Sequence, residues 1–192
     1  MELEGVRIGY AICGSFCTFE KSFAALRELA KTGAEIVPIM SMAAAATDTR
    51  FGKAEEFIGM AKAITGHDII MTVKEAEPIG PKKLLDLLIV APCTGNSLAK
   101  IASGIADTAV TMAVKSHLRN ERPVLIGIST NDGLGTAAKN IGILMNRKNI
   151  YLIPFTQDDC VKKPNSLIAK FDKLIPAAEA ALDARQLQPV IG

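Results

Sequence analysis

Small polar side chains gather in residues 91–100, Ala-Pro-Cys-Thr-Gly-Asn-Ser-Leu-Ala-Lys, directly after the apolar run 84–90. Such a run is typical of a strand buried on both faces, and the apolar residues that follow recur at helical spacing. At the start of a helix, free backbone N–H groups and the helix dipole favour an anion. The segment therefore predicts an anion-binding strand-to-helix turn. The alternative is an ordinary loop in which Asn96 or Ser97 caps the helix.

The rest of the chain supplies the elements that would position this turn. Strand-like apolar runs alternate with segments whose apolar residues recur every three or four positions, the pattern of amphipathic helices. Since parallel strands are connected through crossover helices, we predict a three-layer α/β/α Rossmann-like fold with a six-stranded parallel sheet, in a single domain spanning residues 1–192. The expected strands are residues 6–12, 35–40, 69–73, 84–90, 124–128 and 149–155, and the expected helices include 19–31, 51–65, one that Asp107 or Thr108 caps, and 167–184.

Four loops leave the carboxyl ends of expected strands, where ligand sites lie in such folds. All four are rich in hydroxyl, amide or glycine residues, and they are Gly14–Thr18, Ser41–Ala43, Pro92–Ser97 and Ser129–Gly135. Together they predict a site for an anionic ligand held largely by backbone amides. The sequence has no G-x-G-x-x-G after the first strand and no G-x-x-x-x-G-K-[ST]. An NAD-type or ATP-type site of the usual form is therefore disfavoured, and an FMN-type phosphate is favoured.

Composition excludes several classes of function. The 192 residues carry 22 basic and 20 acidic side chains, a net charge of +2, without the basic stripe that binds nucleic acid. No apolar run approaches the roughly 20 residues of a membrane span, and Met1–Glu4 lacks the start of a signal peptide, so we expect a cytoplasmic protein. Cys13 and Cys17 are expected to be buried thiols. His67 and His117, both expected at the surface, lack the spacing of metal ligands, so no metal site is predicted.

Residues 91–102, Ala-Pro-Cys-Thr-Gly-Asn-Ser-Leu-Ala-Lys-Ile-Ala, with Gly-Ile-Ala-Asp at 104–107, resemble the flavoprotein superfamily. That superfamily contains the cysteinyl decarboxylases and the flavin prenyltransferases, in which an Ala-Pro-x-Ser/Thr-x-Asn-Thr loop precedes a helix and a Gly-x-x-Asp-Asn. The resemblance implies FMN-binding residues in the loops after the first, second, fourth and fifth strands. By position, these implied residues are Gly14, Ser15, Thr18, Ser41, Cys93, Thr94, Asn96 and Ser129.

Four further segments, 76–81, 118–123, 129–135 and 162–166, are similar to one family within this superfamily, the B subunits of dipicolinate synthase from spore-forming bacteria. This resemblance implies a cytoplasmic subunit, in the mother cell of a sporulating bacterium, that takes part in oxidising dihydrodipicolinate, or its hydroxytetrahydro precursor, to dipicolinate. The implied partners are the A subunit, which supplies NAD(P), and further copies of the chain in a homo-oligomer. A dianionic substrate needs cationic groups. Arg119 and Arg122 are predicted to bind it, and the catalytic residue is not identified.

Two alternatives stay open at this point. One is a non-catalytic partner of the A subunit that retains the flavoprotein scaffold, and the other is a flavin prenyltransferase or decarboxylase-like enzyme. The decarboxylases carry a catalytic His shortly before their central strand and a Pro-x-Met-Asn-x-x-Met segment that clamps the substrate. Here residues 72–77 contain no His, residues 129–135 replace the clamp, and Gly95 and Thr108 stand where Ala and Asn are commoner. Cysteine decarboxylation is therefore disfavoured.

Overall fold

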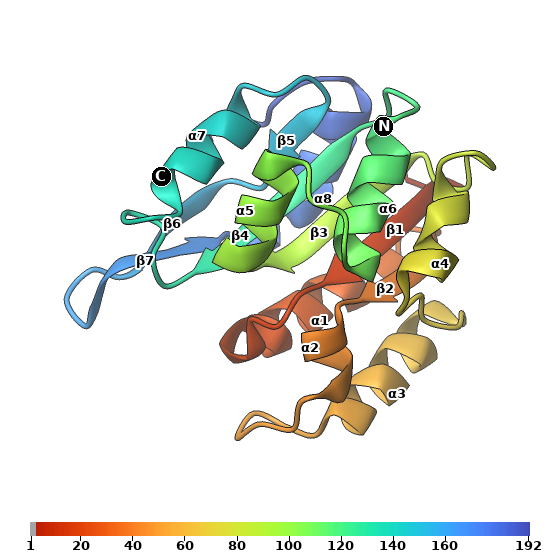
Figure 1. The fold of residues 1–192 in the computed structure, drawn as a ribbon, viewed down its shortest axis with the longest axis horizontal. Coiled ribbons are helices and arrows are strands. Elements are labelled where there is room, and N and C mark those ends of the chain that lie inside the picture. The colour runs from red at the N-terminus through yellow and green to blue at the C-terminus, as the bar shows by residue number, and fades with distance from the viewer. Residues whose placement is uncertain (1–2) are drawn as a thin grey trace.

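The computed structural model describes residues 3–192 and shows a seven-stranded sheet with helices on both faces (Figure 1). Met1 and Glu2, at the start of the segment expected to lack a signal peptide, lie outside the described residues. The strands are β1 (Arg7–Ile12), β2 (Glu35–Met40), β3 (Leu87–Cys93), β4 (Val124–Thr130), β5 (Ile150–Leu152), β6 (Phe155–Asp159) and β7 (Lys163–Ala169). The helices are α1 (Phe19–Ala30), α2 (Met42–Ala46), α3 (Ala54–Thr65), α4 (Val73–Ala76), α5 (Gly95–Ser103), α6 (Ala109–Leu118), α7 (Ala138–Met145) and α8 (Leu174–Leu182), and the 3₁₀ turns are η1 (Phe16–Thr18), η2 (Glu77–Ile79) and η3 (Phe171–Lys173).

Strand β4 is the branching point of the sheet. The strand order is β2-β1-β3-β4-β7-β6, and β5 pairs with β4 outside this path. The first half of β4 pairs in parallel with β5, whereas its last residues, Ser129 and Thr130, pair with antiparallel β7. The β6–β7 hairpin, drawn in blue, therefore extends the sheet at the carboxyl end of β4 and projects beyond it (Figure 1).

Two apolar layers hold the helices against the sheet. All seven residues of both β3 and β4 are buried, as expected for central parallel strands covered on both faces. One layer is built from α1, α3 and α8, whose buried residues include Phe23, Phe57 and Leu174. The other is built largely from α5, α6 and α7, with Leu98 and Val110 among its buried residues. This packing fixes the loops that follow β1, β3 and β4 at one edge of the sheet.

The predicted α/β class is confirmed, and the first half of the sheet follows the prediction closely. Four expected strands are present as β1, β2, β3 and β4. The expected third strand, residues 69–73, is reduced to a single bridge between Ile39 and Ile70. The reason is a capping box that starts α4 at this point. The Thr72 side chain accepts from Glu75 N, and the Glu75 carboxylate accepts from Thr72 N.

The last third of the chain differs most from the prediction. The expected strand 149–155 is two strands, β5 and β6, because Pro154 lies between them. The expected helix 167–184 is wrong at its start, since residues 163–169 form β7 and the helix begins at Leu174. Pro164 is tolerated in β7 because β4 pairs only with residues further along that strand. The sheet therefore has seven strands and is mixed, where six parallel strands were expected.

Candidate functional site

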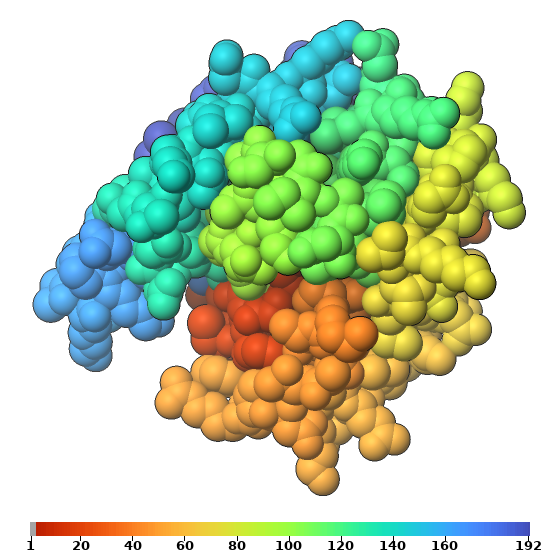
Figure 2. All heavy atoms as spheres, in the orientation of Figure 1, coloured from red at the N-terminus to blue at the C-terminus, as the bar shows by residue number. Residues whose placement is uncertain are grey.

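A cavity of about 620 Å³ opens at the carboxyl ends of β1, β3 and β4. Its walls are the first loop with η1, the start of α5, the end of β4 and the β6–β7 hairpin, and its rim includes residues 50 and 51. In Figure 2 a hollow separates the blue β6–β7 turn from the red and orange segments. Six of the eight predicted cofactor residues line it: Gly14, Ser15, Thr18, Thr94, Asn96 and Ser129.

Three of these residues form a directed chain of hydroxyl groups between β1 and β4. Ser129 Oγ donates to Thr18 Oγ1 at 3.1 Å, and Thr18 Oγ1 donates to the Ser15 carbonyl oxygen at 2.7 Å. Because the hydrogen of Ser129 is used in this way, Ser15 is the donor in the 2.8 Å contact between Ser15 Oγ and Ser129 Oγ. Ser15 stands at the exposed end of the chain, so its hydroxyl can turn to a ligand while Thr18 and Ser129 hold the loop in place.

The start of α5 presents backbone donors to the cavity. Thr94 is the N-cap, and its side chain accepts from Ser97 N at 3.2 Å, which corrects the expectation that Asn96 or Ser97 caps this helix. The N–H groups of Gly95 and Asn96 begin the helix, so the helix gives them no acceptor. Gly95 and Asn96 also line the cavity. The arrangement matches the predicted strand-to-helix turn and favours a negatively charged group in front of it.

Gly95 lets the end of β4 approach this helix closely. The Thr130 hydroxyl donates to the Asp132 carboxylate, and both residues line the cavity. A Cβ at position 95 would lie 2.6 Å from Thr130 Oγ1 and 2.9 Å from Asp132 Oδ1. A methyl group here would displace one or both of these side chains, which favours glycine at this position.

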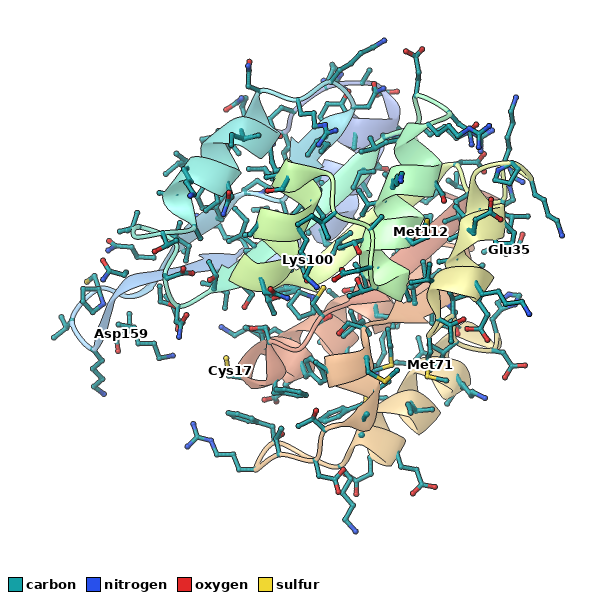
Figure 3. All side chains as sticks on the ribbon, viewed as in Figure 1. Cys17, Glu35, Met71, Lys100, Met112 and Asp159 are labelled. Carbon is teal, nitrogen blue, oxygen red and sulfur yellow. The ribbon has the colours of Figure 1, made fainter. Side chains whose placement is uncertain are left out.

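The hairpin side of the cavity carries a closed ion pair. Lys163 Nζ lies 2.6 Å from Asp158 Oδ2, and this carboxylate raises the pKa of Lys163. Across the opening, η1 carries Cys17, whose side chain is exposed, contrary to the expectation of a buried thiol. Figure 3 labels Cys17 and Asp159 on the two segments that border the opening. The charges of this wall largely cancel, so the wall adds little net attraction for an anion.

Two predicted cofactor residues do not line the cavity. Ser41 caps α2 by accepting from Ala44 N at 3.2 Å, and it lies in the second loop behind the first. Cys93 is fully buried in the apolar layer that also contains Cys13. Burial raises the pKa of the Cys93 thiol. The thiol of Cys13 is buried as expected, and both side chains serve packing in this structure.

The two predicted substrate arginines lie away from the cavity. Arg122 pairs with Asp86 at 3.0 Å and donates to the Leu85 carbonyl, and Arg7 pairs with the same carboxylate at 2.7 Å. These residues stand at the amino ends of β1, β3 and β4, at the opposite edge of the sheet from the loops described above. Arg119 lines a separate cavity of about 340 Å³. The structure therefore does not bring Arg119 and Arg122 to the predicted anion site.

Comparison with known proteins identifies the family. The sequence model of the flavoprotein family matches residues 1–170. The chain belongs to the flavoprotein family. It is 47% identical over 189 residues to the B subunit of dipicolinate synthase from Bacillus subtilis (strain 168), an alignment that covers 98% of this chain and 94% of that protein.

Two solved structures show the same fold as this flavoprotein. The crystal structure of the dipicolinate synthase B subunit from Bacillus halodurans C has a TM-score of 0.92 and 43% identity, covering 100% of this chain and 98% of that one. The FMN-dependent cysteine decarboxylase SpaF has a TM-score of 0.67 and 25% identity, covering 95% and 98%. The resemblance to flavoproteins, and within them to B subunits of dipicolinate synthase, is confirmed.

Neither histidine of this flavoprotein lines the cavity. His67 is exposed, as expected, just after the end of α3. His117 was expected at the surface but is only 1% exposed, because α6 packs it against the start of β4, where its Nε2 lies 3.0 Å from the Pro123 carbonyl oxygen. Its Nδ1 has no hydrogen-bond partner, and burial lowers the pKa of His117 to about 4.

Sequence reasoning missed the polar and aromatic residues that close the cavity from distant segments. Arg50 and Phe51 come from the connection between α2 and α3, and Asp158 and Lys163 come from the β6–β7 hairpin. Gly52 is a turn signal beside the first pair, but no local pattern tells that this turn meets the first loop. The second pair lies in a region for which the wrong elements were predicted.

Residues 3–192 contain neither a metal-binding cluster of side chains nor a membrane-spanning helix. Within that range no group of three or more His, Cys, Asp or Glu side chains is placed to hold a metal ion. None of the helices in that range combines the length and the apolar character that crossing a membrane requires.

Proposed function

We propose that this flavoprotein is the B subunit of a dipicolinate synthase and takes part in oxidising dihydrodipicolinate, or its hydroxytetrahydro precursor, to dipicolinate. The similarity over 98% of the chain to a relative of that name carries the proposal. That relative is called a subunit, which supports a partner subunit. In this proposal the partner is the A subunit, and it supplies NAD(P). By the same similarity, we place the protein in the cytoplasm of the mother cell during sporulation.

We further propose that the cavity binds FMN. Its volume of about 620 Å³ falls within the roughly 300–1,000 Å³ of small-molecule sites. The Ser15 hydroxyl and the first N–H groups of η1 would face the phosphate, and Thr18 would hold this loop in place. Thr94 and Asn96 would lie along the ring. The SpaF structure, described as FMN-dependent, supports this assignment. When bound, FMN supplies a hydride acceptor.

The reaction removes a hydride and a proton from the dihydropyridine ring and leaves the aromatic dicarboxylate. Starting from the hydroxytetrahydro precursor, a molecule of water is also lost. In this chain, the N–H groups at the start of α5 can orient a carboxylate of the substrate. The Thr130–Asp132 pair and the β6–β7 hairpin form one wall of the cavity. These are binding and orienting roles, and the acceptor for the hydride comes from a cofactor.

The alternative of a flavin prenyltransferase or decarboxylase-like enzyme has less support, because the relative matched over 98% of the chain is a dipicolinate synthase subunit and no His among residues 3–192 lines the cavity. The remaining alternative is a non-catalytic partner that completes the A subunit. Each alternative predicts a different result from the synthase hypothesis in an assay with the purified A subunit.

The test is a reconstitution assay that measures the rate of dipicolinate formation from dihydrodipicolinate. The A subunit is assayed alone and with this chain, each with and without FMN and NAD(P). We expect activity to require both chains, and an FMN requirement to mark this chain as a catalytic flavoprotein. Activity that requires both chains but not FMN favours the supporting partner. An equal rate with the A subunit alone contradicts the proposal.

We also propose that the chain forms a homo-oligomer. Exposed apolar side chains on α2 and α7, namely Met42, Ile143 and Met145, offer surface for contacts between copies. Light scattering coupled to gel filtration should give a mass that is a multiple of the 20.4 kDa chain. A mass of one chain at micromolar concentration would contradict this part.

A further inference from the structure

The rim of the cavity carries a rigid two-residue turn between α2 and α3. Thr49 N donates to the Gly52 carbonyl at 3.0 Å and Gly52 N donates to that of Thr49 at 3.1 Å, so Arg50 and Phe51 form the tip. Gly52 has φ +144, and a Cβ there would lie 2.8 Å from the Phe57 ring, which favours glycine. In Figure 1 this orange turn projects to the same side as the blue β6–β7 hairpin.

The base of the turn is tied to the start of α3. Asp48 Oδ1 accepts from Ala54 N at 2.8 Å, and Glu56 Oε2 accepts from Lys53 N at 3.0 Å. These bonds satisfy the first backbone donors at the start of α3. They also tie the residues before and after the turn, Asp48 and Lys53, to that helix. The tip is therefore held in one place, although its side chains are in contact with solvent.

The two tip residues are stacked and face the cavity. The guanidinium carbon of Arg50 lies 4.9 Å from the centroid of the Phe51 ring, and both residues line the cavity. Phe51 is 46% exposed, a large apolar surface for a side chain at a cavity rim. Together with Phe16, Phe51 also lines an adjoining aromatic cavity of about 350 Å³, so the ring surface continues inward.

Arg50 is an unneutralised cation at this rim. No carboxylate lies within ion-pair distance of Arg50 among residues 3–192. The other cation of the cavity, Lys163, is already paired with Asp158. A guanidinium group stacked on a ring presents its edge in a fixed fork, which suits a carboxylate better than a flexible ammonium group does.

We propose that the Arg50–Phe51 turn is the substrate-recognition element of the cavity and that it selects a planar ring with carboxylate substituents. The Arg50 guanidinium binds a ring carboxylate in a bidentate manner, and the Phe51 face packs against the ring. This inference rests on the proposed function, which supplies the substrate class. It assigns to this turn the anion-binding role that the sequence had placed on Arg119 and Arg122.

The test is calorimetric titration of the purified full chain with dipicolinate, pyridine-2-carboxylate and pyridine. The variants are Arg50→Gln, Arg50→Lys and Phe51→Leu, and Arg185→Gln is a control that removes an equal charge from an exposed ion pair far along the chain. We expect dipicolinate to bind more tightly than the monocarboxylate, and pyridine to bind least. Arg50→Gln should weaken dipicolinate binding tenfold or more, Arg50→Lys and Phe51→Leu should weaken it less, and the control should bind as wild type does.

Dipicolinate binding that is equal in wild type and Arg50→Gln, or absent in both, overturns the inference. Thermal unfolding of each variant separates a loss of affinity from a loss of folding. Because the tip is solvent-exposed, its substitution should leave the unfolding midpoint within about 2 °C of the wild-type value. The reconstitution assay separates this inference from the proposed function. If Arg50→Gln turns dihydrodipicolinate over with an unchanged KM, recognition by the turn is refuted and the synthase function stands. If binding depends on Arg50 but no turnover occurs, the synthase function is refuted and recognition by the turn stands.

Discussion

Replacing Gly95 by alanine should weaken ligand binding while leaving the fold intact. The added Cβ would lie 2.6 Å from Thr130 Oγ1 and 2.9 Å from Asp132 Oδ1, both inside ordinary contact distance. Each oxygen must move by roughly half an ångström or more, at a cost of about 1–3 kcal/mol. Alanine is a better helix former than glycine by up to about 1 kcal/mol, which offsets part of this cost. The atoms in contact are side-chain ends, so the cavity wall moves and the chain stays folded.

The expected effect on binding follows from the position of this wall. Gly95 and Asn96 present their N–H groups to the ligand beside the displaced Thr130 and Asp132. This wall is proposed to lie along the uncharged flavin ring, and losing one hydrogen bond to it costs about 0.5–1.5 kcal/mol, which is about a two- to a tenfold loss of affinity. The assay is fluorescence titration with FMN, combined with urea unfolding of each variant.

Two further variants test the reasoning. Gly59→Ala lies within α3, where an added Cβ meets nothing within 4 Å, so it should gain about 0.5–1 kcal/mol of stability and bind FMN as wild type does. Thr130→Ala added to Gly95→Ala removes the nearest atom and releases Asp132, so it should restore much of the affinity. A folded Gly95→Ala protein that binds FMN as tightly as wild type would refute the close-approach argument.

Three other substitutions have expected outcomes. The pKa of His117 is about 4 in the folded chain against 6.5 as its ordinary value, so the unfolded chain binds the proton more tightly. Stability is therefore full above pH 6.5 and falls by up to about 3 kcal/mol as the pH drops towards 4. His117→Gln should flatten this dependence in urea unfolding at several pH values, and an unchanged slope would contradict it. Ser129→Ala removes a bond to Thr18 and should cost about 1–2 kcal/mol together with part of the FMN affinity, with a chemical melt and titration as the readouts. Asp86→Asn weakens the pair with Arg7 and should cost about 1–2 kcal/mol. Because the Arg7 hydrogen bond holds the pKa of Asp86 below 3.8, this loss should appear above that pH and vanish as the pH falls below it, and a pH-independent loss would argue against the ion pair.

The first two thirds of the fold were predictable because the signals there are local. Apolar runs marked the central strands, and helical spacing predicted the helix over 51–65, which ends at Thr65 before Gly66, a glycine with positive φ. The β6–β7 hairpin was not predictable in the same way. Residues 166–169 are all buried because they pair with β4 and β6, and a short apolar run does not tell a strand from the start of a helix.

Part of the candidate site was also predictable from local signals, and part was not. Gly14, Ser15, Thr94 and Ser129 meet because the carboxyl ends of parallel strands lie at one edge of a sheet, a rule that needs only strand positions. The tip at Arg50 could not be placed, because it reaches the rim through a turn whose position depends on the packing of α2 and α3.

The most direct measurement is an equilibrium titration of the purified chain with FMN, followed by flavin fluorescence and by visible absorbance after gel filtration. We predict saturable uptake of about one FMN per chain. Ser15→Ala should weaken it about tenfold, and Arg185→Gln should not change it. A chain that stays colourless, or that binds FMN equally well with Ser15→Ala, would contradict a flavin site at the carboxyl ends of β1, β3 and β4.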